Sequence, residues 1–113
     1  EMIGVHLIID GVLHHRVDKE VGIRILTELP ALIGMKILAG PLVVEGLPEN
    51  PGWTGFVIID KSHIAIHTFH DGNGVCIDVF SCKTFNEEVV SCYLKKHLPL
   101  KKVKSQVLER SEK

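Results

Sequence analysis

The chain has 113 residues, of which 45% are hydrophobic, and its formal net charge is −1. This length predicts a single domain spanning residues 1–113. The balanced charge argues against a nucleic-acid-binding protein, which would carry a basic stripe. No apolar run approaches the ~20 residues of a transmembrane helix, so we expect no membrane partner. The three cysteines form no CxxC pair and indicate free thiols, so we expect a reducing, cytoplasmic location.

The first third of the chain predicts a strand followed by a helix. Residues 5–11 are largely apolar and end in glycine, a pattern typical of a strand. His14 and His15 follow in a loop, and we interpret them as solvated because no third metal ligand lies nearby. Asp18 is an N-cap candidate for a helix with one apolar face, and Pro30 should kink or end its regular part. That face would comprise Val21, Ile23, Ile25, Leu26, Leu29 and Leu32.

The rest of the chain predicts a sheet and a second helix. Strand candidates are residues 36–45, 54–60, 62–70 and 75–82, with a loop over 46–52. Pro41 favours an edge position for the first of these strands. Asn86 caps a helix that ends near His97, and the polar residues after Val103 predict a poorly ordered tail. We therefore expect an α+β fold: a two-layer α/β sandwich, with an antiparallel sheet and two helices on one face.

The hairpin over residues 62–82 gathers the reactive side chains. Alternation places His63, His67, Asp78 and Cys82 on one face and the aliphatic residues on the other. We expect the helices to cover the aliphatic face and leave the polar face open. We predict a four-residue loop over 71–74, because it would pair His67 with Asp78, a carboxylate that could fix the histidine tautomer. A two-residue Asn-Gly turn would shift the pairs by two residues and keep every face.

Two common kinds of site fit this hairpin poorly. On a strand, His63 and His67 lie about 13 Å apart, too far to share one metal ion, so we expect no metal. Ser62 begins a strand and is not part of a G-x-S-x-G elbow, which disfavours a hydrolase without excluding one. The Gly72-Asn73-Gly74 turn joins two strands and is not a phosphate-binding loop.

The stretch over residues 62–82 resembles the small, prokaryotic-type S-adenosylmethionine decarboxylases. That family carries a Glu-Ser-His segment, then Ile-His-Thr, a short turn, and Val-Asp-Val-Phe-Thr-Cys. The corresponding segments here are Lys61-Ser62-His63, Ile66-His67-Thr68 and Ile77-Asp78-Val79-Phe80-Ser81-Cys82. Weaker similarity at residues 54–55 and 4–10 extends the resemblance over most of the chain.

The resemblance implies an enzyme that makes a pyruvoyl cofactor from its own serine. Ser62 Oγ would attack the carbonyl of Lys61, and a base at His67 would remove the Ser62 α-proton. The chain would split into a β chain, 1–61, and an α chain, 62–113. The new carbonyl would bind the substrate amine and accept electrons as carbon dioxide leaves. Cys82 matches the family's acid, which reprotonates the substrate carbon, and Thr54 matches a residue that aids self-cleavage.

The resemblance also implies a substrate and a partner. It predicts decarboxylation of S-adenosylmethionine for polyamine (spermidine) synthesis, by a homodimer with active sites at the subunit interface. Asp10 corresponds in position to the family's acidic residue on the first strand. Phe69 and Asp71 lie where the family has an aromatic-Pro-Glu segment. We expect these three residues to bind the substrate.

The sequence departs from the family pattern most clearly at Lys61, where the family usually has glutamate. The acyl shift uses only the backbone carbonyl of this residue, so lysine is compatible with cleavage. Three alternatives remain open at this point: an enzyme acting on another amino acid such as arginine, a non-enzymatic homologue that stays uncleaved, and a hydrolase that uses Ser62 directly.

Overall fold

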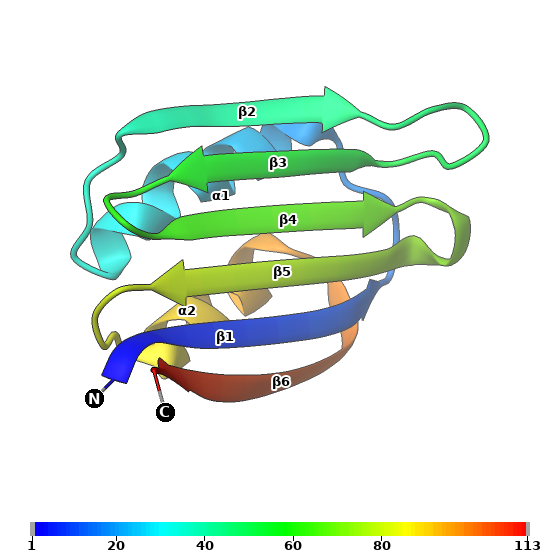
Figure 1. Cartoon of the computed structure of the whole chain (residues 1–113). Helices are drawn as coiled ribbons and strands as arrows, with labels where there is room; N and C mark the ends of the chain where they lie inside the picture. Colours follow the sequence, from blue (N-terminus) through cyan, green and yellow to red (C-terminus); the bar gives the residue numbers. More distant parts are fainter. Residues whose placement is uncertain (1, 113) are drawn as a thin grey trace.

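Six antiparallel strands form one sheet in the order β2-β3-β4-β5-β1-β6, and two helices cover one of its faces (Figure 1). The computed structural model describes residues 2–112. The strands are β1 (Met2–Leu13), β2 (Ala39–Glu45), β3 (Trp53–Ile58), β4 (His63–Phe69), β5 (Gly74–Ser81) and β6 (Leu100–Ser111). The helices are α1 (Lys19–Leu32) and α2 (Glu87–His97), with a short 3₁₀ turn, η1 (Asp71–Asn73), between β4 and β5. This arrangement confirms the predicted two-layer sandwich.

Capping side chains fix the start of both helices. The Asp18 carboxylate accepts a hydrogen bond from the Val21 N–H at 3.3 Å, and Asn86 Oδ1 accepts one from the Glu88 N–H at 3.0 Å.

The predicted apolar face of α1 is partly wrong, because Ile23 and Leu32 are exposed. The buried residues of α1 are Gly22, Ile25, Leu26, Leu29 and Pro30.

The predicted disordered tail is wrong, because residues 100–111 form a strand. β6 pairs with β1 along almost its whole length, so β1 lies between β5 and β6. Most β6 side chains are exposed, and the pairing rests on backbone hydrogen bonds that polar residues do not prevent. Lys101, Lys102 and Lys104 are exposed on this edge strand, where charge discourages pairing with another chain. β2 forms the opposite edge, as Pro41 predicted.

The predicted register of the β4–β5 hairpin is also wrong, although its faces are correct. His67 lies opposite Cys76 and Ala65 lies opposite Asp78, a shift of two residues. The cause is His70, which adopts a helical conformation and donates its backbone N–H to the Pro51 carbonyl at 2.9 Å. The strand therefore ends at Phe69, and the loop spans residues 70–73. Because the shift is even, the residues within β4 and β5 keep their predicted faces. Cys82 lies beyond the end of β5, and its side chain packs partly against the hydrophobic core.

The closest helix–sheet approach provides a test of the packing. A Cβ atom at Gly22 of α1 would lie 2.5 Å from the Trp53 ring, whereas one at Gly74 would meet nothing closer than 3.8 Å. Alanine favours a helix by about 1 kcal/mol over glycine, so a net loss of stability at Gly22 must come from the clash. We expect Gly22→Ala to lower the free energy of unfolding by about 1–2 kcal/mol. Urea denaturation measures this, with Gly74→Ala as control; equal stability of both variants would contradict the packing.

Candidate active site

A row of polar side chains crosses the open face of the sheet near the β4–β5 loop. Backbone pairing sets His67 on β4 opposite Thr54 on β3 and opposite Cys76 on β5. Cys76 in turn lies opposite Asp10 on β1, and Asp10 lies opposite Lys104 on β6. We call these five residues the polar row. They share the face that the helices leave uncovered because side chains at paired positions point the same way.

Two contacts organise the polar row. Thr54 Oγ1 lies 3.0 Å from His67 Nδ1, so the hydroxyl holds the imidazole ring in one orientation. The Cys76 thiol lies opposite Asp10, and burial chiefly, with the carboxylates of Asp10 and Asp78, raises the pKa of the thiol. The thiol therefore stays protonated beside Asp10. Thr54 and His67 form one pair and Cys76 and Asp10 another.

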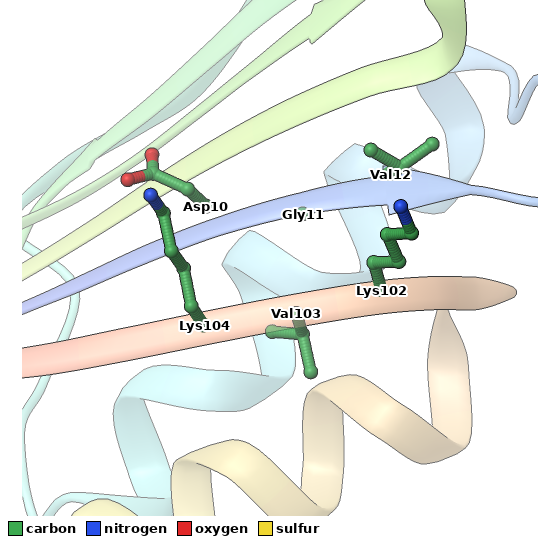
Figure 2. Close-up of a pocket in the computed structure, with 6 residues that line it drawn as sticks. All are labelled: Asp10, Gly11, Val12, Lys102, Val103 and Lys104. Atoms are coloured by element: carbon green, nitrogen blue, oxygen red, sulfur yellow. The ribbon is translucent and has the colours of Figure 1, made fainter.

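A hollow of about 530 Å³ borders the Asp10 end of the polar row. It is lined by Asp10, Gly11, Val12, Lys102, Val103 and Lys104. Figure 2 shows the Lys104 side chain reaching toward the Asp10 carboxylate, with Lys102 farther along β6 beside Val12. One carboxylate and two ammonium groups thus share a small surface, which suits a ligand that carries charges of both signs.

Aromatic rings form a second row between the polar row and the β3–β4 turn. The His63 ring stacks on Phe56 at 5.3 Å and lies 5.9 Å from the Phe80 ring. Burial chiefly, and the nearby His6, lower the pKa of His63, while Asp78 acts in the opposite direction. Asp78 Oδ1 lies 3.0 Å from His6 Nε2. Asp78 therefore orients His6, and its predicted place beside His67 is wrong.

Ser62 lies at the end of the two-residue turn that joins β3 to β4. The Ile59 N–H donates to the Ser62 carbonyl at 3.0 Å and closes the turn around Asp60 and Lys61. Asp60 has a φ of 60°, as expected for the first central residue of a tight hairpin turn. Ser62 is only 5% exposed, and its Oγ accepts a hydrogen bond from the Cys82 N–H at 2.9 Å. The serine is thus held rigidly beside the residue predicted to be the acid.

The bond between Lys61 and Ser62 borders a second hollow, of about 540 Å³. This hollow is lined by Met2, Ile3, Asp60, Lys61, Phe80, Cys82 and Glu112. Lys61 lines this hollow and is exposed to solvent. A small molecule in this hollow would contact both the predicted scissile bond and Cys82.

The structure divides the predicted site residues into two groups. Lys61, Ser62 and Cys82 lie together at the β3–β4 turn. Thr54 and His67 lie together in the polar row, with Asp10 in the same row. His67 follows Ser62 by five residues along β4, which corresponds to about 16 Å at the rise of a strand. Within one chain, His67 cannot reach the Ser62 α-carbon.

The two remaining predicted residues lie beyond the polar row. Phe69 ends β4 and is 40% exposed, and Asp71 is an exposed residue of η1. They therefore belong to the same end of the sheet as His67. Sequence reasoning missed Cys76 and Lys104 as members of this region, because only the β5–β1 and β1–β6 registers bring them beside Asp10.

The described residues contain neither a candidate metal cluster nor a membrane-spanning helix. Among residues 2–112, no three His, Cys, Asp or Glu side chains are grouped to hold a metal ion. No helix within the same residues is long and apolar enough to cross a membrane.

The fold and the Ser62–Cys82 contact define a small α+β protein with a buried serine at a hairpin turn, bonded to the backbone of a cysteine. Comparison with known families identifies one match, described as S-adenosylmethionine decarboxylase, over residues 6–111. Because the match spans nearly the whole chain, the chain belongs to the S-adenosylmethionine decarboxylase family.

Individual relatives agree with this membership. An S-adenosylmethionine decarboxylase proenzyme of Clostridium botulinum (strain Langeland) is 34% identical, covering 96% of this chain and 95% of the relative. A proenzyme of the same description from Hydrogenobaculum sp. (strain Y04AAS1) is 33% identical over 71% of this chain and 60% of the relative. The crystal structure of the adenosylmethionine decarboxylase from Aquifex aeolicus VF5 has a TM-score of 0.74 and 26% identity, and covers 100% of this chain and 97% of its own.

The stacking of His63 on Phe56 provides a test of the side-chain packing on the open face. In the folded chain its pKa lies below the ordinary 6.5, so protonation is disfavoured by folding. The stability that neutral His63 provides is present above pH 6.5 and falls as the pH drops through its folded pKa. We expect Phe56→Ala to expose the ring and raise this pKa toward 6.5, as measured by NMR titration. Phe69→Ala is the control, and an unchanged pKa in Phe56→Ala would contradict the stacking.

Proposed function

We propose that this chain is a proenzyme that cleaves itself between Lys61 and Ser62 and then decarboxylates S-adenosylmethionine for polyamine (spermidine) synthesis. The observation that carries this proposal is the hydrogen bond from the Cys82 N–H to Ser62 Oγ at a tight turn. It joins a buried serine hydroxyl, next to the bond that we propose to be broken, to the backbone of Cys82. The proenzyme descriptions of the relatives support the same conclusion.

The first step requires only groups at the turn. Ser62 Oγ adds to the Lys61 carbonyl carbon, the C–N bond breaks, and an ester replaces the peptide bond, while the hydroxyl proton passes to the Ser62 nitrogen, which becomes a free amine. The Cys82 N–H donates to Oγ and so favours the more negative form of this oxygen as its proton leaves. Lys61 contributes its carbonyl, and its exposed side chain explains why lysine is compatible with a position that is usually glutamate.

The pyruvoyl group fits the position of Ser62. The serine is buried, immediately precedes β4, and adjoins the hollow of about 540 Å³ that could admit a substrate. A pyruvoyl group there supplies a carbonyl that accepts electrons during decarboxylation. Cys82 lies beside it and acts as the acid that returns a proton to the substrate carbon. Its neighbour Phe80 and the residues 2–3 form the wall of the same hollow.

The Thr54–His67 pair acts from a second copy of the chain. His67 is about 16 Å from Ser62 along its own strand, too far to remove the Ser62 α-proton.

The open face is also unusually apolar for a surface in contact with water. Its exposed apolar residues include Leu42 (64%), Val44 (55%), Phe56 (39%), Ile58 (41%) and Leu108 (42%).

A homodimer satisfies both observations. A twofold axis that runs across the strands, between two open faces, would place the polar row of one subunit over the β3–β4 turn of the other. His67 of one chain could then serve Ser62 of its partner. The same arrangement would bring Asp10, Phe69 and Asp71 to this turn together with His67. The carboxylates of Asp10 and Asp71 suit a substrate that carries a sulfonium and an amine.

Self-cleavage is tested with the purified chain and a Ser62→Ala variant. We expect the parent to give two fragments, 1–61 and 62–113, the second without a free amino terminus, and Ser62→Ala to stay intact. The fragments are identified by intact-mass spectrometry. Carbon dioxide release from carboxyl-labelled S-adenosylmethionine, with labelled arginine in parallel, then identifies the substrate. A parent that remains one chain after prolonged warming would contradict self-cleavage and favour a non-enzymatic homologue.

Transfer between subunits is tested by mixing two defective chains. His67→Ala alone should cleave at least about 100-fold more slowly, because it lacks the base, and Ser62→Ala alone has no nucleophile. Co-expression should restore cleavage, specifically of the His67→Ala chain, because the Ser62→Ala partner supplies His67. Mass tags distinguish the chains. Absence of restored cleavage in demonstrated mixed dimers would show that His67 acts within its own chain.

A further inference from the structure

We infer that the backbone N–H of Ile59 is the oxyanion donor of the self-cleavage reaction, an inference that rests on the proposed function. This N–H points at the Ser62 carbonyl oxygen, with a distance of 3.0 Å between nitrogen and oxygen. The carbonyl belongs to the residue that reacts. The hydrogen bond therefore does more than close a turn.

The chemistry of the elimination step places negative charge on this carbonyl. After the acyl shift, the ester joins Ser62 Oγ to the Lys61 carbonyl, and the Ser62 nitrogen is a free amine. A base removes the Ser62 α-proton, and the electron pair moves into the Ser62 carbonyl as an enolate. The pair returns to form the Cα–Cβ double bond, and the Cβ–Oγ bond breaks with Lys61 leaving as a carboxylate. Water then replaces the nitrogen, which departs as ammonia.

The Ile59 N–H is well placed to stabilise the enolate. A donor already aimed at the oxygen where charge develops lowers the barrier without any reorganisation. Ile59 has no solvent-exposed surface and Ser62 has little, so water competes weakly for this oxygen. In a water-poor site, a hydrogen bond to a charged oxygen is stronger than one to a neutral carbonyl.

Two features hold the Ile59 N–H in position: the packing of its own side chain and the backbone pairing of the residue before it. The Ile59 side chain is part of the hydrophobic core. The preceding residue, Ile58, accepts a hydrogen bond from the Leu38 N–H at 2.8 Å and pairs with His63 on β4. Ile59 therefore cannot turn away when the Lys61–Ser62 bond breaks. The same hydrogen bond would afterwards join the two fragments.

The donor can be removed without changing the side chain. Replacing Ile59 by its α-hydroxy acid converts the N–H to an ester oxygen. We expect cleavage to slow by about 100-fold, while the preceding acyl shift continues. The Lys61–Ser62 ester should therefore accumulate. Hydroxylamine would then release a 62–113 fragment with a free serine amine, which differs from the blocked fragment of complete cleavage.

A matched control removes an equivalent bond elsewhere. The Gly46 N–H donates to the Gly52 carbonyl at 2.8 Å and closes the β2–β3 loop far from Ser62. Replacing Gly46 by glycolic acid should cost similar stability, measured by thermal unfolding, and leave the cleavage rate within about threefold of the parent. If the Ile59 ester does not fold, a glycine inserted between Asp60 and Lys61 opens the same turn, and the same ester accumulation is expected.

The outcomes separate this inference from the proposed function. Cleavage of the folded Ile59 variant at the rate of the Gly46 control would overturn the role of the Ile59 N–H. Slow cleavage in which hydroxylamine releases no 62–113 fragment with a free serine amine would also overturn it, since the defect would then precede the elimination. A parent chain that never cleaves would instead contradict the proposed function itself.

Discussion

Both helices pack on one face of the sheet, and this one-sided cover determines which residues of each strand are buried and which lie on the open face. On β4 and β5 the residues beneath the helices are almost all aliphatic and buried, whereas their neighbours on the other face are histidine, cysteine, aspartate and phenylalanine. A sheet with two helices on the same side has no second layer with which to bury the open face. The chain uses that face for polar and aromatic side chains, and a second copy would complete the layer.

The chemically important groups lie at opposite ends of the same strand. Ser62 is held at the start of β4 by backbone donors from Ile59 and Cys82, and His67 is held near its end by Thr54. The backbone contacts at Ser62 leave its carbonyl and hydroxyl fixed without help from ionisable side chains. Within one subunit, the two groups are therefore separated by most of the length of β4.

Sequence patterns predicted the features that depend on local periodicity. Alternation gave the correct faces for the hairpin, the caps at Asp18 and Asn86 are present, and Pro41 lies on an edge strand. The hairpin register was not predictable in this way, because it depends on the His70 N–H bonding to Pro51, which lies nineteen residues earlier in the chain. β6 was missed because an edge strand needs little apolar surface and looks like a solvated tail. The roles of Cys76 and Lys104 follow only once β1 is known to lie between β5 and β6.

The position of β1 has a consequence for a chain cut after Lys61. Fragment 1–61 would contain β1, β2 and β3, and fragment 62–113 would contain β4, β5 and β6, so the sheet order interleaves the two pieces. β1 is flanked on both sides by strands of the other fragment, and β3 pairs with β4. Separation of the two fragments would break three strand pairings together, those of β1 with β5, β1 with β6 and β3 with β4. The cut protein would persist as one interlocked body, and its unfolding would become a dissociation whose midpoint rises with protein concentration.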